Sequence, residues 1–154
     1  MKEKMYNRNG ERLSAREIVL IYGGNELVEL KSKHLAELER ANMLAMIEAV
    51  HRNAADKGFY DGEPNTFGDN IALMHSELSE ALEEHRNRMP DLYFVTDENG
   101  HQKPEGTLVE LADVVIRIFD YVGSLDKAEE FVDIIHKKHE YNQTRTYRHG
   151  NKKL

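Results

Sequence analysis

Acidic side chains at helical spacing are the residues of this sequence best suited to do chemistry. Residues 108–122 contain only four charged side chains, spaced three, four and three apart: Glu110, Asp113, Arg117 and Asp120. On a helix this spacing forms one narrow polar stripe on a surface that is otherwise apolar. We expect such a helix to be largely buried, with its stripe facing a cation, because buried charges need a partner.

A second acidic pair precedes this helix in the chain. Glu77 and Glu80 are three apart, and Glu83 and Glu84 follow them. An isolated pair of this kind is usually part of a solvated helix face, and Glu83 is the expected surface residue. If the two acidic helices are antiparallel, four carboxylates converge: Glu77, Glu80, Glu110 and Asp113. Their repulsion favours a bound divalent cation, and carboxylate oxygens suit Mg²⁺, with Mn²⁺ as an alternative.

The C-terminal segment KKHEYNQTRTYRHGNKK is basic, although the protein as a whole is acidic. Lys138, Asn142 and Arg145 are spaced four and three apart, so on a helix they form a cationic and amide face that could bind phosphates. The alternative is a basic tail that complements the C-terminal end of a helix and remains in water.

Composition limits the class of protein. The 154 residues suffice for a single domain, 1–154, and the absence of cysteine excludes disulfides and thiolate metal sites. A net charge of −7 argues against binding a nucleic-acid polymer. The sequence has neither an apolar run of the ~20 residues that cross a bilayer nor the apolar core of a signal peptide, so we expect a cytoplasmic protein that does not bind membranes.

Apolar periodicity and breaker residues predict an all-α helical bundle. A short helix around SAREIVLIY, ended by Gly23-Gly24, lies within an N-terminal extension, 1–40. Longer helices are expected over residues 25–57, 66–88, 108–122 and 125–144. Between the two acidic helices, Asn99-Gly100 favours a hairpin turn and hence a short β-like flap. A helix that is apolar nearly all round is hard to cover within one chain, so at least a homodimer is expected.

The segments HSELSEALEEHR, PEGTLVELADVVIRIFDYV and KHEYNQTRTYRHGNKK resemble the MazG-type nucleoside triphosphate pyrophosphohydrolases of the all-α superfamily. The resemblance spans residues 42–154. The family motif is ExxE followed, one connection later, by ExxD, which fall here on Glu77 and Glu80 and on Glu110 and Asp113. The resemblance implies that these four bind magnesium. The oligomer expected from the apolar helix is a homodimer or a homotetramer.

The reaction implied by the resemblance is hydrolysis of (deoxy)nucleoside triphosphates between the α and β phosphates, which releases a nucleoside monophosphate and pyrophosphate. Metal-bound water would be the nucleophile. Glu80 is our choice of general base. In the last helix the family contacts phosphate or base through a Lys and an Asn, here Lys138 and Asn142, and Arg145 and Tyr147 are assigned to the substrate as well.

Two features depart from the family pattern or extend beyond it. Many members have a further Glu directly before ExxE, where this chain has Ser76. The first forty residues lie outside the match, and the flap around Tyr93 and Phe94 is longer than in the smallest members. Substrate choice is expected to depend on these parts, and the sequence does not identify the base or the sugar.

Three other interpretations remain open. Phosphoribosyl-ATP pyrophosphatase shares the general fold and is the nearest rival within the enzyme class. Glu48-x-x-His51 and Asp133-x-x-His136 could be elements of a di-iron carboxylate bundle. A helical interaction module without catalysis could instead use its acidic stripe to bind a basic partner.

Overall fold

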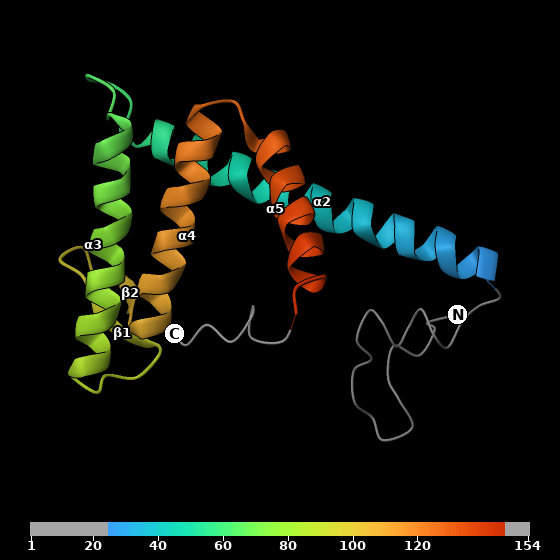
Figure 1. The fold of residues 1–154 in the computed structure, drawn as a ribbon. Coiled ribbons are helices and arrows are strands. Elements are labelled where there is room, and N and C mark those ends of the chain that lie inside the picture. The colour runs from blue at the N-terminus through green and yellow to red at the C-terminus, as the bar shows by residue number, and fades with distance from the viewer. Residues whose placement is uncertain (1–24, 147–154) are drawn as a thin grey trace. The chain divides into compact units, whose positions relative to one another are not determined.

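Four helices and one antiparallel hairpin make up residues 25–146, the part of the chain that this computed structural model describes; side chains are described from His34 onward (Figure 1). The elements are, in order, α2 (Asn25–Asp56), α3 (Phe67–Arg86), β1 (Tyr93–Thr96), β2 (Gln102–Glu105), α4 (Thr107–Ser124) and α5 (Ala128–Gln143). The protein is therefore mostly helical with a small two-stranded sheet, as expected for an all-α protein with a flap. The short helix expected before Gly23-Gly24 lies outside the described residues.

The chain divides into two units, with the boundary between Met43 and Leu44 inside α2. The second unit begins two residues after the start of the expected family match at Asn42. Both acidic pairs and the cavity described below belong to this unit. Its buried apolar side chains come from four helices: Ile47, Ala81, Val122 and Val132.

Helix α3 begins at a capping box. The Thr66 hydroxyl accepts a hydrogen bond from the Asp69 amide (3.2 Å), and the Asp69 carboxylate accepts one from the Thr66 amide (2.9 Å). This pair satisfies two backbone donors that the first turn of a helix leaves free. The helix ends at Arg86, two residues before the expected end, and Arg88 adopts a left-handed conformation with φ of 56°.

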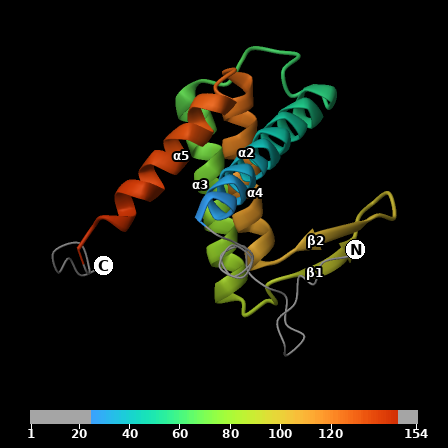
Figure 2. The same cartoon turned by 90° about the vertical axis from the view of Figure 1, so that its right-hand side faces the viewer.

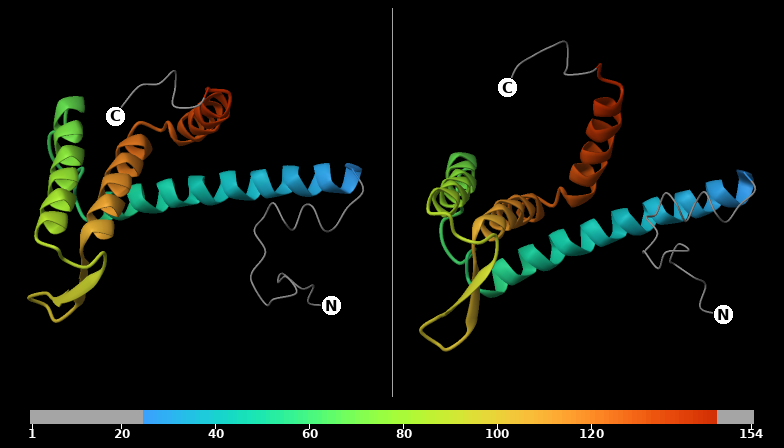
Figure 3. Two further views of the ribbon diagram at one scale, coloured as in Figure 1. Left: turned by 60° about the horizontal axis from the view of Figure 1, so that its bottom comes forward. Right: turned by 90° about the horizontal axis from the view of Figure 1, so that it is seen from below.

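Helices α3 and α4 lie side by side and antiparallel (Figures 1 and 3). Phe67, at the start of α3, is in ring contact with Tyr121, near the end of α4, at 5.9 Å between centroids. The connection between the helices contains the hairpin, so the chain reverses direction there. This arrangement places the acidic residues of the two helices opposite one another.

The hairpin confirms the expected flap. Tyr93 pairs with Glu105 and Thr96 pairs with Gln102. Its turn closes through a hydrogen bond from the Asp97 amide to the His101 carbonyl (2.9 Å), and Gly100 has a positive φ of 84°. A positive φ is accessible to glycine at little cost, which is why Asn99-Gly100 is an informative turn signal.

The expectation that residues 108–122 are largely buried is wrong for the single chain. Leu108, Leu111 and Val115 are 57%, 42% and 45% exposed, although Glu110 and Val122 are buried. The physical reason is that helices of the same chain pack against only part of the circumference of α4. None of the helices within residues 25–146 is long and apolar enough to span a membrane.

Candidate metal and nucleotide site

The start of α4 is fixed by Gly106. A Cβ at this position would lie 2.5 Å from the Pro90 carbonyl oxygen, and its φ of 123° disfavours any other residue. The Gly106 carbonyl accepts a hydrogen bond from the Glu110 amide (3.1 Å). The close approach of backbone to backbone therefore determines where Glu110 and Asp113, in the first two turns, meet α3.

Three of the four predicted carboxylates converge. Glu77 and Glu80 of α3 and Glu110 of α4 each offer an oxygen, and these oxygens all lie within 4.8 Å of one another. We call these three residues the carboxylate group. Glu77 and Glu110 are each only 6% exposed, whereas Glu80 is exposed. Asp113 lies one turn beyond Glu110 and is close enough to Glu77 for the two charges to interact.

Repulsion and burial both act on this group. Burial is the largest cause of the raised pKa of Glu110, followed by the negative charges of Glu80, Asp113 and Glu77. Burial also raises the pKa of Asp113, with Glu77 adding to the effect and Arg117 opposing it. A bound cation would reverse these effects by stabilising the ionised carboxylates.

Two cations approach the carboxylates, and the sequence assigned neither to the site. Arg117 lies on the stripe of α4 and donates through Nε to Glu77 Oε1 at 2.5 Å. Lys103 of β2 binds Glu105 at 2.6 Å, and its pKa is raised by Glu105 and, to a smaller extent, by Glu110 and Asp113. The stripe spacing could have indicated Arg117. Nothing in the sequence marks Lys103, because the hairpin alone brings it to the first turns of α4.

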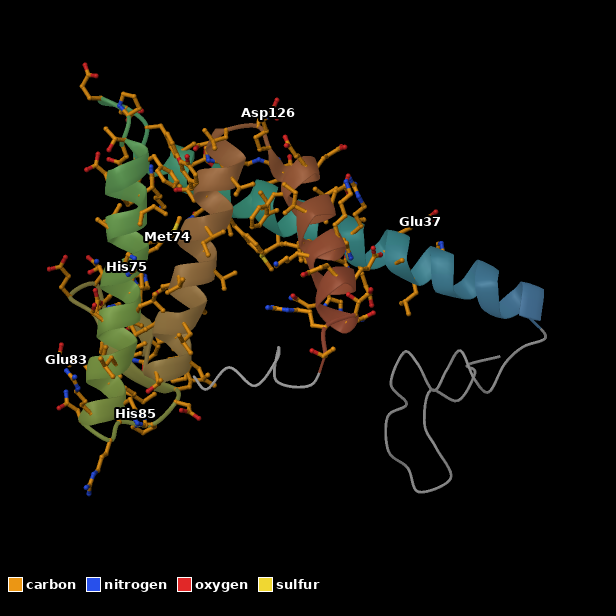
Figure 4. The ribbon with its side chains drawn as sticks, in the orientation of Figure 1. Glu37, Met74, His75, Glu83, His85 and Asp126 are labelled. Carbon is orange, nitrogen blue, oxygen red and sulfur yellow. The ribbon has the colours of Figure 1, made fainter. Side chains whose placement is uncertain are left out.

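Hydrogen bonds orient two acidic side chains of α3, one inside the carboxylate group and one outside it. Ser76 Oγ donates to Glu80 Oε1 at 3.1 Å, so the residue that departs from the family pattern helps to hold the neighbouring carboxylate. Tyr93 of the hairpin donates to Glu84 Oε1 at 3.4 Å. Glu83 is exposed, as expected, and lies on the side of α3 away from α4 (Figure 4).

A cavity of about 490 Å³ adjoins the carboxylates. Its charged lining includes Glu77, Asp113 and Arg117, so it is continuous with the proposed metal site. Its apolar lining comes from the second half of α2, the loop after it and α4, through residues such as Ala54, Phe59 and Ile116. A volume of several hundred Å³ with mainly apolar walls and few polar groups is typical of a small-molecule site.

Asp120 lines the same cavity and is held by two donors. Tyr60 donates its hydroxyl hydrogen to Asp120 Oδ1 at 2.7 Å, and His51 Nδ1 lies 2.9 Å from the same oxygen. The rings of His51 and Tyr60 meet edge to face with centroids 4.9 Å apart. Gly123 permits this packing because a Cβ there would lie 2.6 Å from the His51 Cβ.

The predicted phosphate-binding residues of the C-terminal segment are not brought to the carboxylates within this chain. Lys138, Asn142 and Arg145 are all exposed, and Lys138 Nζ lies over the Tyr141 ring at 5.1 Å from its centroid. Helix α5 diverges from α3 and α4 toward its C-terminal end (Figure 2). Tyr147 lies outside the described residues. The assignment of these residues to substrate stays a prediction.

Two of the four residues of the di-iron interpretation are bound by other side chains. His51 binds Asp120, Glu48 pairs with Arg52 on the same helix, and Asp133 and His136 lie on α5. Within the described side chains, the carboxylate group alone has the geometry to hold a metal ion, and it includes none of the four.

No protein family model, curated protein or solved structure matches this chain.

Proposed function

We propose that this protein is a magnesium-dependent nucleoside triphosphate pyrophosphohydrolase that cleaves between the α and β phosphates. The observation that carries the proposal is the carboxylate group, in which oxygens from two helices lie within 4.8 Å of one another beside a cavity of about 490 Å³. The group could hold metal-bound phosphates while the cavity encloses the rest of a nucleotide. The resemblance of Glu77, Glu80, Glu110 and Asp113 to the ExxE and ExxD motifs of MazG-type enzymes supports the same reaction.

The donor set fits a hard divalent cation. All donors are carboxylate oxygens, which magnesium and manganese prefer, and the raised pKa of Glu110 reflects repulsion that such a cation would relieve. Glu77, Glu80 and Glu110 would hold it, with Asp113 as a fourth ligand or as a ligand to a second ion. When bound, magnesium would neutralise phosphate charge and lower the pKa of a coordinated water.

The side chains of this group and around it would supply the general base and the positive charges that bind phosphate. Glu80 is the most exposed of the three carboxylates and is oriented by Ser76, which suits it to accept the proton of the attacking water. Arg117, which lines the cavity and pairs with Glu77, would bind a phosphate oxygen. Lys103 offers a second positive charge from the hairpin.

We propose that the functional form is a homodimer or a homotetramer. Leu108, Leu111 and Val115 form one exposed apolar face of α4, and Leu78 and Leu82 are 44% and 48% exposed on α3. A second copy packed against these faces would remove them from water. In that assembly, Lys138, Asn142 and Arg145 could serve the carboxylate group of a neighbouring copy, since α5 diverges from the group of its own chain.

The experiment is a pyrophosphate-release assay over canonical and modified (deoxy)nucleoside triphosphates, with and without magnesium. We expect magnesium-dependent release, and Glu110→Gln should reduce it at least about a hundredfold because a buried ligand loses its charge. Glu83→Gln is the matched control, since it makes the same change on the outer side of α3 and should retain full activity.

A lack of release from every nucleotide, by a folded protein, would overturn the proposal. Thermal unfolding with magnesium plus nucleotide then separates the alternatives, because a ligand stabilises the fold that binds it. An interaction module would show no such stabilisation. Iron in the purified protein would instead support the di-iron interpretation.

A further inference from the structure

Asp113 and Asp120 both line the cavity, and Asp113 is the one that lies near the carboxylate group. The two residues are seven apart on α4, so they share a face and are separated by about 10 Å along the helix axis. A ligand whose phosphates lie at the carboxylate group can therefore extend along α4 toward Asp120. The apolar side chains of Ala54, Phe59 and Ile116 line the path.

The two oxygens of Asp120 have different roles. Oδ1 accepts hydrogen bonds from Tyr60 and His51, which fix the orientation of the carboxylate. Oδ2 has no hydrogen-bond partner among residues 34–146. Asn53, which also lines the cavity, likewise has no side-chain hydrogen bond within this part of the chain. The cavity thus presents one oriented carboxylate oxygen as an acceptor, and one amide that can either donate or accept.

We propose that this cavity binds the base of the nucleotide and that Asp120 selects bases that carry an exocyclic amino group. This inference rests on the proposed function and adds a substrate class to it. An amino group directed at Oδ2 forms a charge-assisted hydrogen bond. A keto oxygen in the same place would face the carboxylate oxygen, so two acceptors would meet and neither would gain a hydrogen bond. The Asn53 amide can donate to one kind of ring atom or accept from the other, so the preference for an amino over a keto base comes from Asp120.

The matched pairs dCTP and dUTP, and dATP and dITP, test this selection. The second member of each pair carries a keto group in place of the amino group and an N–H in place of the adjacent ring nitrogen acceptor. Pyrophosphate release should favour the amino member of at least one pair by roughly 10- to 100-fold in kcat/KM. Asp120→Asn should abolish or invert that ratio. The asparagine oxygen can still accept from Tyr60 and His51, while its amide hydrogens replace the acceptor that faces the cavity.

Asp126→Asn is the matched control. It makes the same chemical change at the turn between α4 and α5, outside the cavity lining (Figure 4), and its left-handed conformation, with φ of 55°, suits asparagine. This variant should leave the ratio unchanged. Equal kcat/KM for both members of each pair, or the same ratio in wild type and Asp120→Asn, would overturn the proposal.

A binding measurement separates this proposal from the proposed function. Calorimetry with dCMP against dUMP, and dAMP against dIMP, needs no hydrolysis. Preferential binding of an amino base, lost in Asp120→Asn, would support the cavity's role even if no triphosphate were hydrolysed. Equal binding of both members, or no binding by any of the four, would contradict it even if hydrolysis occurred.

Discussion

Both ends of the polar stripe on α4 carry carboxylates, but the neighbours of these carboxylates differ. At the N-terminal end, Glu110 and Asp113 face the carboxylates of α3, and repulsion together with burial raises the pKa of both. At the C-terminal end, one oxygen of Asp120 is matched by the donors of His51 and Tyr60. One end is short of positive charge, and the other is held in place by hydrogen bonds.

The difference separates an ion-binding arrangement from a positioned recognition group. A carboxylate that lacks donors gains most from a bound cation, whereas a carboxylate fixed by two hydrogen-bond donors can offer its remaining oxygen in a defined direction. The carboxylate in turn affects its donor: burial, followed by the hydrogen bond to Asp120, raises the pKa of Tyr60 to about 12. This hydroxyl therefore remains a donor throughout the physiological pH range.

The largest expected effect is on catalysis at the acidic end. Glu80→Gln should lower kcat by about a hundredfold or more, because a general base contributes on this scale. The magnesium concentration needed for half-maximal activity should rise as well, because Glu80 is also one of the three carboxylates that would hold the cation. Steady-state kinetics over a magnesium series measures both quantities, and normal turnover with unchanged magnesium affinity would exclude Glu80 as the base.

At the other end, Gly123→Ala should destabilise the fold. The new Cβ would lie 2.6 Å from the His51 Cβ, so α2 and α4 must separate at a cost of about 2 kcal/mol in the free energy of unfolding. Stabilisation by magnesium should persist, because the carboxylate group is distant along α4. Gly62→Ala is the control, since a Cβ there meets nothing within 4 Å. Urea unfolding that finds the two variants equally stable would contradict the close packing of His51 on α4.

A smaller effect is expected on how the free energy of unfolding depends on pH and on magnesium. The pKa of Glu110 in the folded protein lies above its ordinary value of 4.5, which applies to the unfolded chain. At a pH between the unfolded and the folded pKa, the folded state therefore binds more protons than the unfolded state. Glu110 therefore lowers the free energy of unfolding more and more as pH rises through this range, because its carboxylate becomes ionised in the folded protein. Without metal at pH 7, Glu110→Gln should be more stable than wild type by about 1 kcal/mol.

The same pair of proteins should respond differently to magnesium. Wild type should gain thermal stability when magnesium is added at pH 7, and Glu110→Gln should gain much less. Without metal, the advantage of the variant should disappear toward pH 4. An advantage that grew as pH fell would show that Glu110 is stabilised, rather than destabilised, as a carboxylate.

The smallest effect is expected at Tyr60. Its raised pKa means that its contribution to stability is complete below pH 10 and is lost as pH rises toward 12. Tyr60→Phe should cost roughly 0.5 kcal/mol at neutral pH, because the hydrogen bond is partly exposed. An absorbance titration of tyrosine ionisation should lose a component near pH 12 in this variant and keep it in Tyr141→Phe. Identical titration curves for Tyr60→Phe and wild type would contradict the hydrogen bond to Asp120.

Local patterns were sufficient to predict most of the elements. The helix predicted from residue 66 begins in the structure at a capping box of Thr66 and Asp69, and Asn99-Gly100 predicted the hairpin. Both signals act between residues that are near in sequence. The helix predicted over residues 125–144 is shorter at its start, since Asp126 adopts a left-handed conformation and α5 begins at Ala128. Burial of α4 was overestimated because apolar periodicity does not tell how much of a helix its own chain can cover.

The sequence by itself determined the helical class and the two acidic pairs at a spacing that places each pair on one helix face, since helix geometry is local and regular. Tertiary structure decided which side chains meet. It brought Glu77, Glu80 and Glu110 together, left Asp113 at the cavity, added Lys103 and Arg117, and joined His51 and Tyr60 to Asp120. These contacts depend on the antiparallel pairing of α3 with α4 and on close approaches at Gly106 and Gly123, and they connect residues too far apart in sequence for any local pattern to specify.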